Sequence, residues 1–166
     1  MDGNNGNRSN AYLTFRLGDE LFATHVGKVL NIVELTKITQ VPRSPEYMLG
    51  IINLRGKALP VIDIRKKFGI ELLDFSIYTT ILVLELSIDN KIVTLGALVD
   101  AVHEVIDIDD SNLLPPPSIG VTYKADFITS VYKKENDDFI MVLDLDSVFS
   151  NDDMLELVTS KEQEGI

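Results

Sequence analysis

Val61-Ile62-Asp63-Ile64, followed by Phe68, recurs about 81 residues later as Val142-Leu143-Asp144-Leu145, followed by Phe149. Each copy is a run of β-branched and aliphatic residues, interrupted by an aspartate and closed by a phenylalanine. The run is typical of a strand, and the aspartate is well placed to cap a short helix that follows it. The chain therefore carries one strand-and-helix unit twice.

A second repeat lies upstream of each copy. The apolar residues Val26, Val29, Ile32, Val33 and Leu35 recur about 73 residues later as Val99, Val102, Val105, Ile106 and Ile108. Because the two repeats follow each other in the same order, most of the chain is a duplicated unit. A unit that buries its apolar face against its twin makes a scaffold with two related surfaces and a seam, and such a plan favours binding over catalysis.

Around ten short strand-like runs, separated by frequent turns, predict an all-β fold. We expect two pseudo-repeated five-stranded β-barrels that share a hydrophobic core, with short helices, in one domain over residues 11–150. The first barrel is placed at about 11–70 and the second at about 78–150, and exchange of strands between them is left open. Residues 1–10 are expected to form a disordered arm, and 151–166 a short acidic helix and tail.

The composition limits the functions that the chain can have. Of the 166 residues, 45% are hydrophobic and 25% charged, as in an ordinary globular domain. The net charge of -11 repels phosphate backbones, so nucleic-acid binding is not expected, whereas a basic patch on a protein partner would be attracted. There is no cysteine, and no apolar stretch is long enough for a signal peptide or a membrane span. We therefore expect a cytoplasmic protein without membrane insertion.

The residues that could carry chemistry do not converge. His25 and His103 have no neighbours at zinc-ligand spacing and are interpreted as core or rim residues. Asp63 and Asp144 recur at matching points of the two copies, which favours helix capping over acid–base catalysis. No serine lies in a nucleophile elbow. The sequence therefore predicts no enzyme, no metal and no cofactor.

Arg55 is the one charged residue that stands out, because it lies at the end of an otherwise apolar run and is followed by Gly56. A guanidinium at this place can form paired hydrogen bonds to carboxylates or to backbone carbonyls. Two interpretations stay open. The side chain either ties the turn to a neighbouring strand or contacts a partner.

The stretch from Gly50 to Arg65, which reads Gly-Ile-Ile-Asn-Leu-Arg-Gly-Lys-Ala-Leu-Pro-Val-Ile-Asp-Ile-Arg, resembles the CheW family, the coupling proteins of bacterial chemotaxis. Two further stretches agree with that family, namely Gly96 to Ile106 with the later Pro115-Pro116-Pro117, and Leu143-Asp144-Leu145 before Phe149. The resemblance covers about residues 11–150. It implies two five-stranded barrels on a shared core.

The resemblance also implies a function, that of a non-catalytic adaptor coupling methyl-accepting chemoreceptors to the histidine kinase CheA. The implied partners are the regulatory domain of that kinase and the cytoplasmic tips of the receptors. The implied location is the cytoplasm, at receptor arrays on the inner membrane. A CheW-like scaffold of a non-flagellar pathway, acting on pili or another kinase output, would have the same sequence features and is the alternative.

Positions carried over from the family give an expected set of contacts. The resemblance assigns kinase binding to Val29, Gly50 and Arg55. It assigns receptor binding to Val26, Val29, Asn31, Ile32, Gly96, Val99 and Val102.

Three positions depart from the family pattern. Asn31 stands where an acidic residue is frequent, Ser130 stands where a glycine is common, and His25 is unusual beside the first apolar run. These departures bear on the choice of partner and leave the expected fold unchanged.

Overall fold

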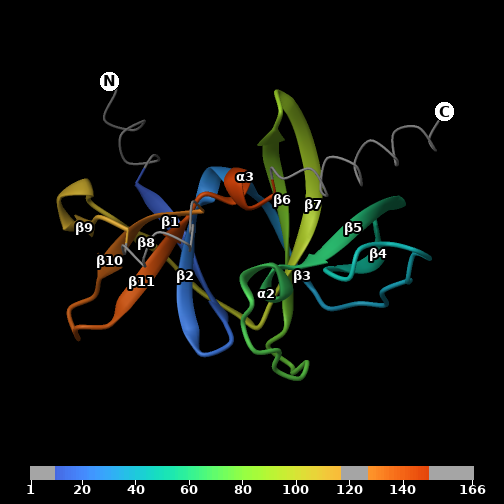
Figure 1. Cartoon of the computed structure of the whole chain (residues 1–166), viewed down its shortest axis with the longest axis horizontal. Coiled ribbons are helices and arrows are strands. Elements are labelled where there is room, and N and C mark those ends of the chain that lie inside the picture. Colours follow the sequence, from blue (N-terminus) through green and yellow to red (C-terminus); the bar gives the residue numbers. More distant parts are fainter. Residues whose placement is uncertain (1–9, 117–126, 150–166) are drawn as a thin grey trace.

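The computed structural model describes residues 10–116 and 127–149. Its strands form two sheets that curl into neighbouring half-barrels, and the short helices α2 and α3 lie near the middle of the molecule (Figure 1). The strands are β1 (Ala11–Leu17), β2 (Glu20–His25), β3 (Val29–Glu34), β4 (Met48–Leu54), β5 (Lys57–Asp63), β6 (Thr80–Ile88), β7 (Lys91–Val99), β8 (Ala101–Asp107), β9 (Leu113–Leu114), β10 (Ile128–Lys133) and β11 (Phe139–Leu143). The helical segments are η1 (Val26–Lys28), α2 (Ile64–Phe68), η2 (Asp110–Asn112) and α3 (Leu145–Val148). The arm expected before residue 10 and the helix and tail expected at 151–166 lie outside the described residues.

Sheet A has the strand order β8-β1-β2-β11-β10-β9, and sheet B has the order β3-β6-β7-β5-β4. The all-β fold with two barrel-like halves and short helices is therefore confirmed. Sheet B has the five strands that were expected, and sheet A has five and the two-residue strand β9.

Each half-barrel combines strands from both copies of the repeat. The hairpin β1–β2 pairs with β8 and β11 of the second copy, and the hairpin β6–β7 pairs with β3 and β5 of the first copy. The expected division into barrels at 11–70 and 78–150 is therefore wrong, and the strand exchange that was left open is present. The short segment η1 leads the chain from β2 in sheet A directly to β3 in sheet B.

The register of the two sheets shows the duplication residue by residue. In each sheet, cross-strand pairs join four residues into a row that runs across four strands. The row in sheet A is Thr14, Ala23, Val142 and Ser130, and the corresponding row in sheet B, in the same order, is Val83, Gly96, Val61 and Gly50. Each row ends at a β-bulge, one beside Ser130 and the other beside Gly50. The two half-barrels are thus structural twins, and any residue of one can be compared with its counterpart in the other.

The hydrophobic core joins the two halves. One large cluster contains residues of both sheets, among them Phe15 of β1, Leu84 of β6 and Phe149 after α3, all fully buried. Burial of side chains of this size stabilises the fold by about 1.5–3 kcal/mol each. The expected shared core is therefore confirmed. A second, smaller cluster fills the inside of sheet B.

The two repeated aspartates both precede helices, but only one caps its helix with its side chain. The Asp63 carboxylate accepts a hydrogen bond from the backbone N–H of Arg65 at 3.1 Å, as an N-cap residue does. Asp144 holds the same position before α3, yet its carboxylate accepts the Ser147 hydroxyl at 2.8 Å and no backbone N–H of the helix. The capping prediction is confirmed for Asp63 and is wrong for the side chain of Asp144.

Candidate binding surface

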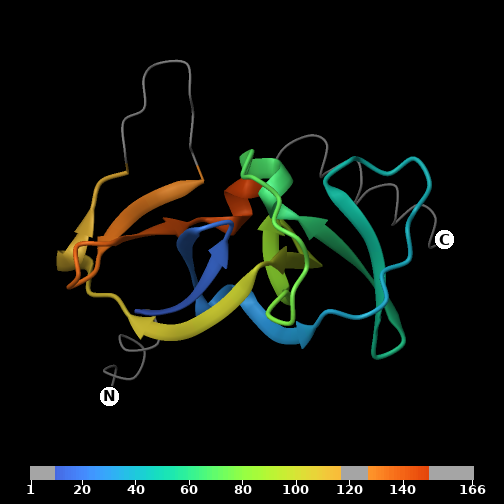
Figure 2. The same ribbon diagram turned by 90° about the horizontal axis from the view of Figure 1, so that it is seen from below.

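An apolar surface lies where the two half-barrels meet. Val26, Val29 and Val102 are partly buried and pack against the large shared cluster. Val29 begins β3 and Val102 lies near the start of β8, so these two valines hold equivalent places in the two repeats. Figure 2 shows β3 and β8 along the same lower side of the molecule, running in opposite directions from its middle. The core therefore reaches the exterior at this seam.

The same two strands carry exposed apolar side chains. Ile32 of β3 is 46% exposed and Val105 of β8 is 58% exposed. Both strands are sheet edges, because among the described residues β3 pairs only with β6 and β8 only with β1. We call Val26, Val29, Ile32, Val102 and Val105 the β3–β8 surface. Exposed apolar residues over a buried core are typical of a protein-binding surface.

Asn31 lies on this edge but turns its side chain to its own strand. Its carboxamide oxygen accepts the backbone N–H of Ile32 at 2.8 Å. An acidic side chain at this place would add a charge to the surface, whereas Asn31 adds none. The surface is therefore uncharged at that point.

Arg55 lies at the tip of the hairpin β4–β5, in a two-residue turn between the paired residues Leu54 and Lys57. Its φ of 52° and the φ of 85° at Gly56 give the turn in which both central residues are left-handed. Asn or Gly fits the first of these positions better than Arg does, so Arg55 occupies this position against the local backbone preference. Within residues 10–116 and 127–149 the exposed guanidinium has no hydrogen bond or ion pair. The interpretation in which Arg55 ties the turn to a neighbouring strand is therefore wrong for the described residues.

Three of the expected contact residues lie beneath the surface. Val99 is fully buried in the shared core. A Cβ on Gly96 would lie 2.8 Å from Cγ2 of Ile81, inside sheet B. Gly50 has a φ of 149°, and a Cβ there would overlap the carbonyl oxygen of Thr39, which forms an isolated β-bridge with Ile51. Val99, Gly96 and Gly50 therefore shape the neighbouring surfaces and do not themselves present a side chain to a partner.

The start of β3 is held in place by an ion pair across the seam. Nζ of Lys28, in η1, lies 2.6 Å from a carboxylate oxygen of Asp146 in α3. The other oxygen of Asp146 accepts the backbone N–H of Ser87 in β6 at 2.9 Å. These contacts fix the connection from β2 to β3, and with it the positions of Val26 and Val29.

The start of β8 is held by a buried network around Arg65. Its guanidinium donates to both carboxylate oxygens of Asp63 at 3.0 Å and to Asp100 at 2.8 Å. Asp100, which lies between β7 and β8, also accepts the backbone N–H of Gly18 at 2.7 Å. Hydrogen bonding to Asp63 raises the pKa of Arg65 above its usual value, although burial opposes the charge. The network therefore joins α2, the β1–β2 turn and the segment that leads into Val102.

Sequence reasoning missed Arg65, although it is among the largest fully buried side chains. The available signal was the pattern Asp63-Ile64-Arg65, in which two opposite charges follow an apolar strand. Its second partner, Asp100, lies 35 residues further along the chain. That distance hides the network until the fold is known.

The remaining candidates have structural places. Nδ1 of His25 accepts the backbone N–H of Gly27 at 2.9 Å, and the His25 ring meets the edge of Tyr12. Among the described residues, no three His, Cys, Asp or Glu side chains gather as metal ligands would. In the same residues, no helix has the length and apolar character of a membrane span.

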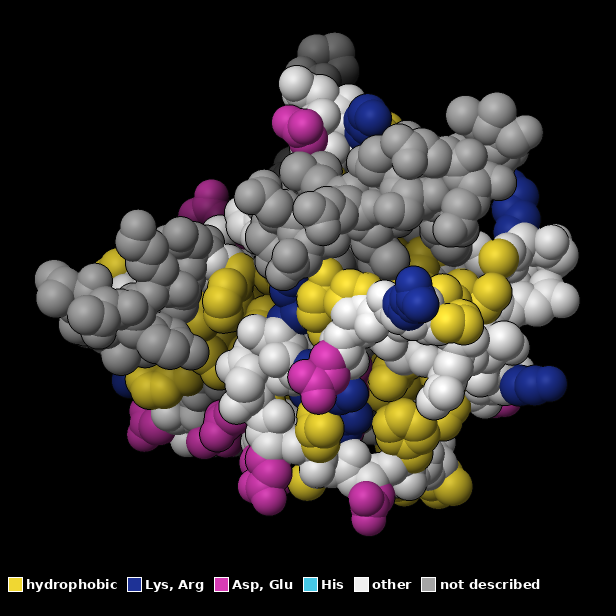
Figure 3. All heavy atoms as spheres, turned by 45° about the vertical axis from the view of Figure 1, so that its right-hand side comes forward, with side chains coloured by type: hydrophobic (Ala, Val, Ile, Leu, Met, Phe, Trp, Pro, Cys, Tyr) yellow, Lys and Arg dark blue, Asp and Glu magenta, His cyan; other side chains and the backbone are white. Residues whose placement is uncertain are grey.

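A further exposed apolar group lies in the loop between α2 and β6. Its members are Leu72, Phe75, Ile77 and Tyr78, with Ile77 90% exposed. Figure 3 shows the side of the molecule that carries the edge of sheet B, where hydrophobic side chains alternate with cationic and acidic ones. None of the expected contact residues belongs to this loop.

Comparisons with known proteins agree with this geometry. The family model described as a CheW-like domain matches residues 11–153. The chain is 32% identical to the chemotaxis protein CheW of Rhizobium meliloti (strain 1021), over 90% of this chain and 92% of that protein. It is 27% identical to the chemotaxis protein CheW of Klebsiella aerogenes, over 86% and 83% of the two chains. The crystal structure of the scaffolding protein TtCheW from Thermoanaerobacter tengcongensis superposes with a TM-score of 0.74, at 36% identity, over 87% of this chain and 95% of that one.

Proposed function

The chain belongs to the CheW family, and we propose on this premise that it is a chemotaxis adaptor that couples methyl-accepting chemoreceptors to the histidine kinase CheA and catalyses no reaction. The observation that supports this most is the match of the CheW-like domain to residues 11–153, nearly the whole chain. The exposed apolar seam of the twin half-barrels supports it independently. Such an adaptor works in the cytoplasm, at receptor arrays on the inner membrane.

The receptor tip docks on the β3–β8 surface in this proposal. Chemoreceptor tips are helical, and an amphipathic helix buries its apolar face in an apolar groove. Val26, Val29 and Val102 supply apolar contact area that rests on a rigid core. Rigid support matters because residues that are already ordered lose little entropy on binding.

The kinase regulatory domain docks on the side of sheet B that carries Arg55. The guanidinium of Arg55 has no internal partner among the described residues, so it can pair with a carboxylate of the kinase without breaking a bond of the folded chain. Gly50 supports this contact through the path of β4, and we assign Val29 to the kinase as well as to the receptor.

The receptor assignment is tested with Ile32→Asp. Ile32 is exposed, so a charge is tolerated by the fold but disfavours an apolar partner. We expect binding to a receptor-tip fragment to weaken by about 2 kcal/mol, roughly thirtyfold, with less kinase activation in a reconstituted mixture of receptor, kinase and adaptor. The matched control is Ile92→Asp, at a 73% exposed apolar position near the β6–β7 turn. Equal loss in both variants would show that the β3–β8 surface is not the receptor site.

The kinase assignment is tested with Arg55→Asn. Asparagine suits the left-handed position of Arg55, so the hairpin keeps or gains stability while the guanidinium is lost. We expect weaker binding to the isolated kinase regulatory domain and unchanged binding to the receptor fragment. Lys57→Asn, in the same hairpin, controls for a general effect of positive charge. Full kinase binding by the Arg55 variant would refute the assignment.

A further inference from the structure

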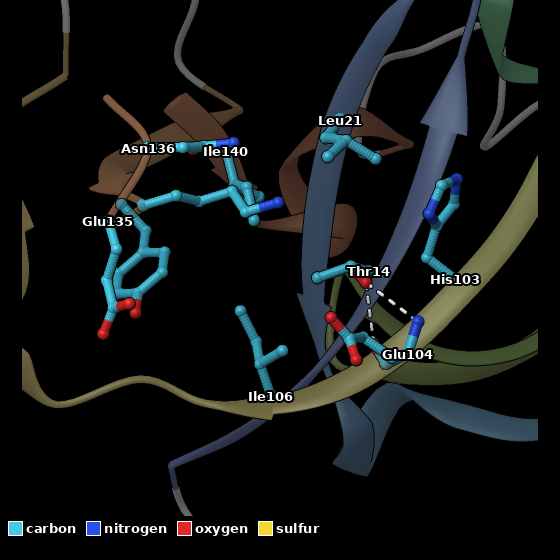
Figure 4. Close-up of a pocket in the computed structure, with 10 residues that line it drawn as sticks. Thr14, Leu21, His103, Glu104, Ile106, Glu135, Asn136 and Ile140 are labelled. Carbon is cyan, nitrogen blue, oxygen red and sulfur yellow. Dashed lines mark hydrogen bonds between the residues drawn. The ribbon is translucent and has the colours of Figure 1, made fainter. Parts of the chain in front are cut away.

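Sheet A encloses a hollow of about 390 Å³ that opens to the exterior. Buried Thr14 and Ile140 form its floor, and half-buried Ile106, Tyr132 and Lys134 form its walls. Figure 4 shows Thr14, Ile106 and Ile140 around the hollow, with Glu104 and Glu135 on opposite sides of it. The volume is within the range of binding pockets for small ligands or for one or two side chains of a peptide.

At the equivalent place of the twin half-barrel, the described residues pack as an aliphatic cluster. The hollow that sheet B does carry, of about 270 Å³, is lined by Ile51, Ile52 and the β4–β5 turn. The paired rows align Thr14 with Val83, so Ile140 corresponds to Leu59 and Tyr132 to Ile52. In sheet B, Val83, Leu59 and Ile52 are buried in a compact aliphatic cluster. The sequence could therefore fill this space with aliphatic side chains, and in sheet A it does not.

Lys134 marks the difference most clearly. It lies two residues after Tyr132, as Leu54 lies two residues after Ile52, and Leu54 packs against the aliphatic cluster of sheet B. A half-buried lysine in place of a packed leucine costs stability, because its rotamers are restricted and its ammonium is partly dehydrated. A binding role for the hollow explains why that cost is retained.

The rim carries a net negative charge. Glu104 and Glu135 stand against one ammonium, that of Lys134, on a chain whose net charge is -11. Glu104 is also fixed in place, because the Thr14 hydroxyl donates to its carbonyl oxygen at 2.7 Å and accepts its backbone N–H at 3.0 Å. A rim of this kind attracts a cationic segment and orients it.

We propose that the hollow in sheet A binds an extended peptide segment of a protein partner, with an apolar side chain in the hollow and lysine or arginine on either side of it facing Glu104 and Glu135. The open edge of β8 runs along the hollow, since β8 pairs only with β1 within the described residues. An extended segment can therefore align with β8 and place alternate side chains inward. The residues that line the hollow differ from those of the β3–β8 surface and from Arg55, but the hollow adjoins the β3–β8 surface along β8.

The experiment uses the full chain labelled with ¹⁵N and three capped peptides. The probe is acetyl-Lys-Leu-Lys-Leu-Lys amide. The charge control replaces lysine with glutamate, and the apolar control replaces leucine with serine. At millimolar peptide we expect the probe alone to shift the amide signals of Thr14, Glu104 and Ile140 while leaving those of Val83 and Leu59 in place. Raising the salt concentration should weaken the shifts, because the rim contacts are screened.

Two variants test the same site from its two sides. Tyr132→Ile with Lys134→Leu copies the filled twin and should abolish the shifts while the fold is kept. Glu104→Gln with Glu135→Gln should weaken binding by about tenfold, whereas Glu85→Gln, at an exposed site on β6, should not.

Three results would overturn the proposal. The first is no shift around the hollow at millimolar probe. The second is an equal shift with the glutamate or serine peptide, which would mean that the site does not select a cationic, apolar segment. The third is undiminished binding by the filled variant, which would place the peptide elsewhere on the chain. The receptor and kinase assignments are tested with other variants, at Ile32 and Arg55, so a failure here is distinguishable from a failure of the proposed function.

Discussion

Two connections cross from one sheet to the other, η1 between β2 and β3 and the junction between β7 and β8. Each is held by an ion pair to a short helix, but the charges are reversed between the two. In one, the helix residue is a cation, Arg65 of α2, and the connection supplies the anion, Asp100. In the other, the helix residue is an anion, Asp146 of α3, and the connection supplies the cation, Lys28. Arg65 and Asp146 are separated by the same 81 residues as the two helices, so they are counterparts in the duplicated unit.

The two pairs differ in exposure as well as in sign. The side chains of Arg65 and Asp100 are 2% and 4% exposed, whereas those of Lys28 and Asp146 are 33% and 26% exposed. Both copies of the repeat therefore hold the connection with an ion pair to the helix, but the two ion pairs differ in the sign of their charges and in their burial. Loss of a partner in the buried pair would leave a charge without solvation, whereas water can replace the lost partner in the hydrated pair.

The largest effect is expected from Arg65→Met. The change leaves Asp63 and Asp100 buried without a cation, and breaking a buried pair in this way costs about 3–5 kcal/mol. Urea unfolding of the variant measures the loss. Lys28→Met, which removes the cation of the other ion pair, should cost less than about 1 kcal/mol because its partner Asp146 stays hydrated. Similar losses in the two variants would show that burial does not distinguish the two anchors.

The second effect compares the two β-bulges. Gly50→Ala places a Cβ against the Thr39 carbonyl at a left-handed φ, and we expect it to cost about 2 kcal/mol or more. Ser130→Ala, at the equivalent bulge of sheet A, should change the free energy of unfolding by no more than about 0.5 kcal/mol. Thermal unfolding of both variants measures the two changes in stability. A tolerated Gly50→Ala would mean that the segment around Thr39 moves away from β4 at little cost.

The duplication and the fold class could be predicted from the sequence because they depend on local, repeated patterns. The apolar run around Val61 recurs at Val142, and alternation within each run fixes which side is buried. The strand exchange could not be predicted in the same way. Whether the β1–β2 hairpin pairs with β3 or with β8 depends on contacts between residues that are far apart in the chain.

The exposure of the candidate contact residues was predicted only in part, for a related reason. Val29, Ile32 and Arg55 lie at the exterior, where a partner can reach them, but Val99 and Gly96 lie inside sheet B and the shared core. A strand pattern gives the face on which a residue lies. It does not tell whether that face is later covered by the other half-barrel.

The third effect compares the interiors of the twins. Lys134→Leu gives sheet A the residue that Leu54 provides in sheet B, and we expect it to raise the free energy of unfolding by about 1 kcal/mol through added apolar burial. The control is the neighbouring Lys133→Leu. Lys133 is 54% exposed and forms only a surface ion pair with Asp137, so its replacement should give no such gain. Urea midpoints of the two variants test this, and a gain only at Lys133 would contradict the twin alignment.

The smallest effect concerns pH, and it also separates the twins. Burial and then the Asp110 carboxylate raise the pKa of Tyr12 above its usual value of 10.0. Its counterpart in sheet B is Ile81, which does not ionise. Because the folded protein disfavours the tyrosinate, the contribution of Tyr12 to stability is complete below about pH 10 and is lost as the pH rises beyond it.

Tyr12→Phe should therefore flatten the alkaline decline in the free energy of unfolding, measured by urea titration from neutral pH to about pH 11. Asp110→Asn should flatten it less, because burial is the larger of the two causes. If the Phe variant kept the full decline, the alkaline sensitivity would arise outside the Tyr12 environment. Tyr12 of sheet A and Ile81 of sheet B would then not differ in their effect on stability at alkaline pH.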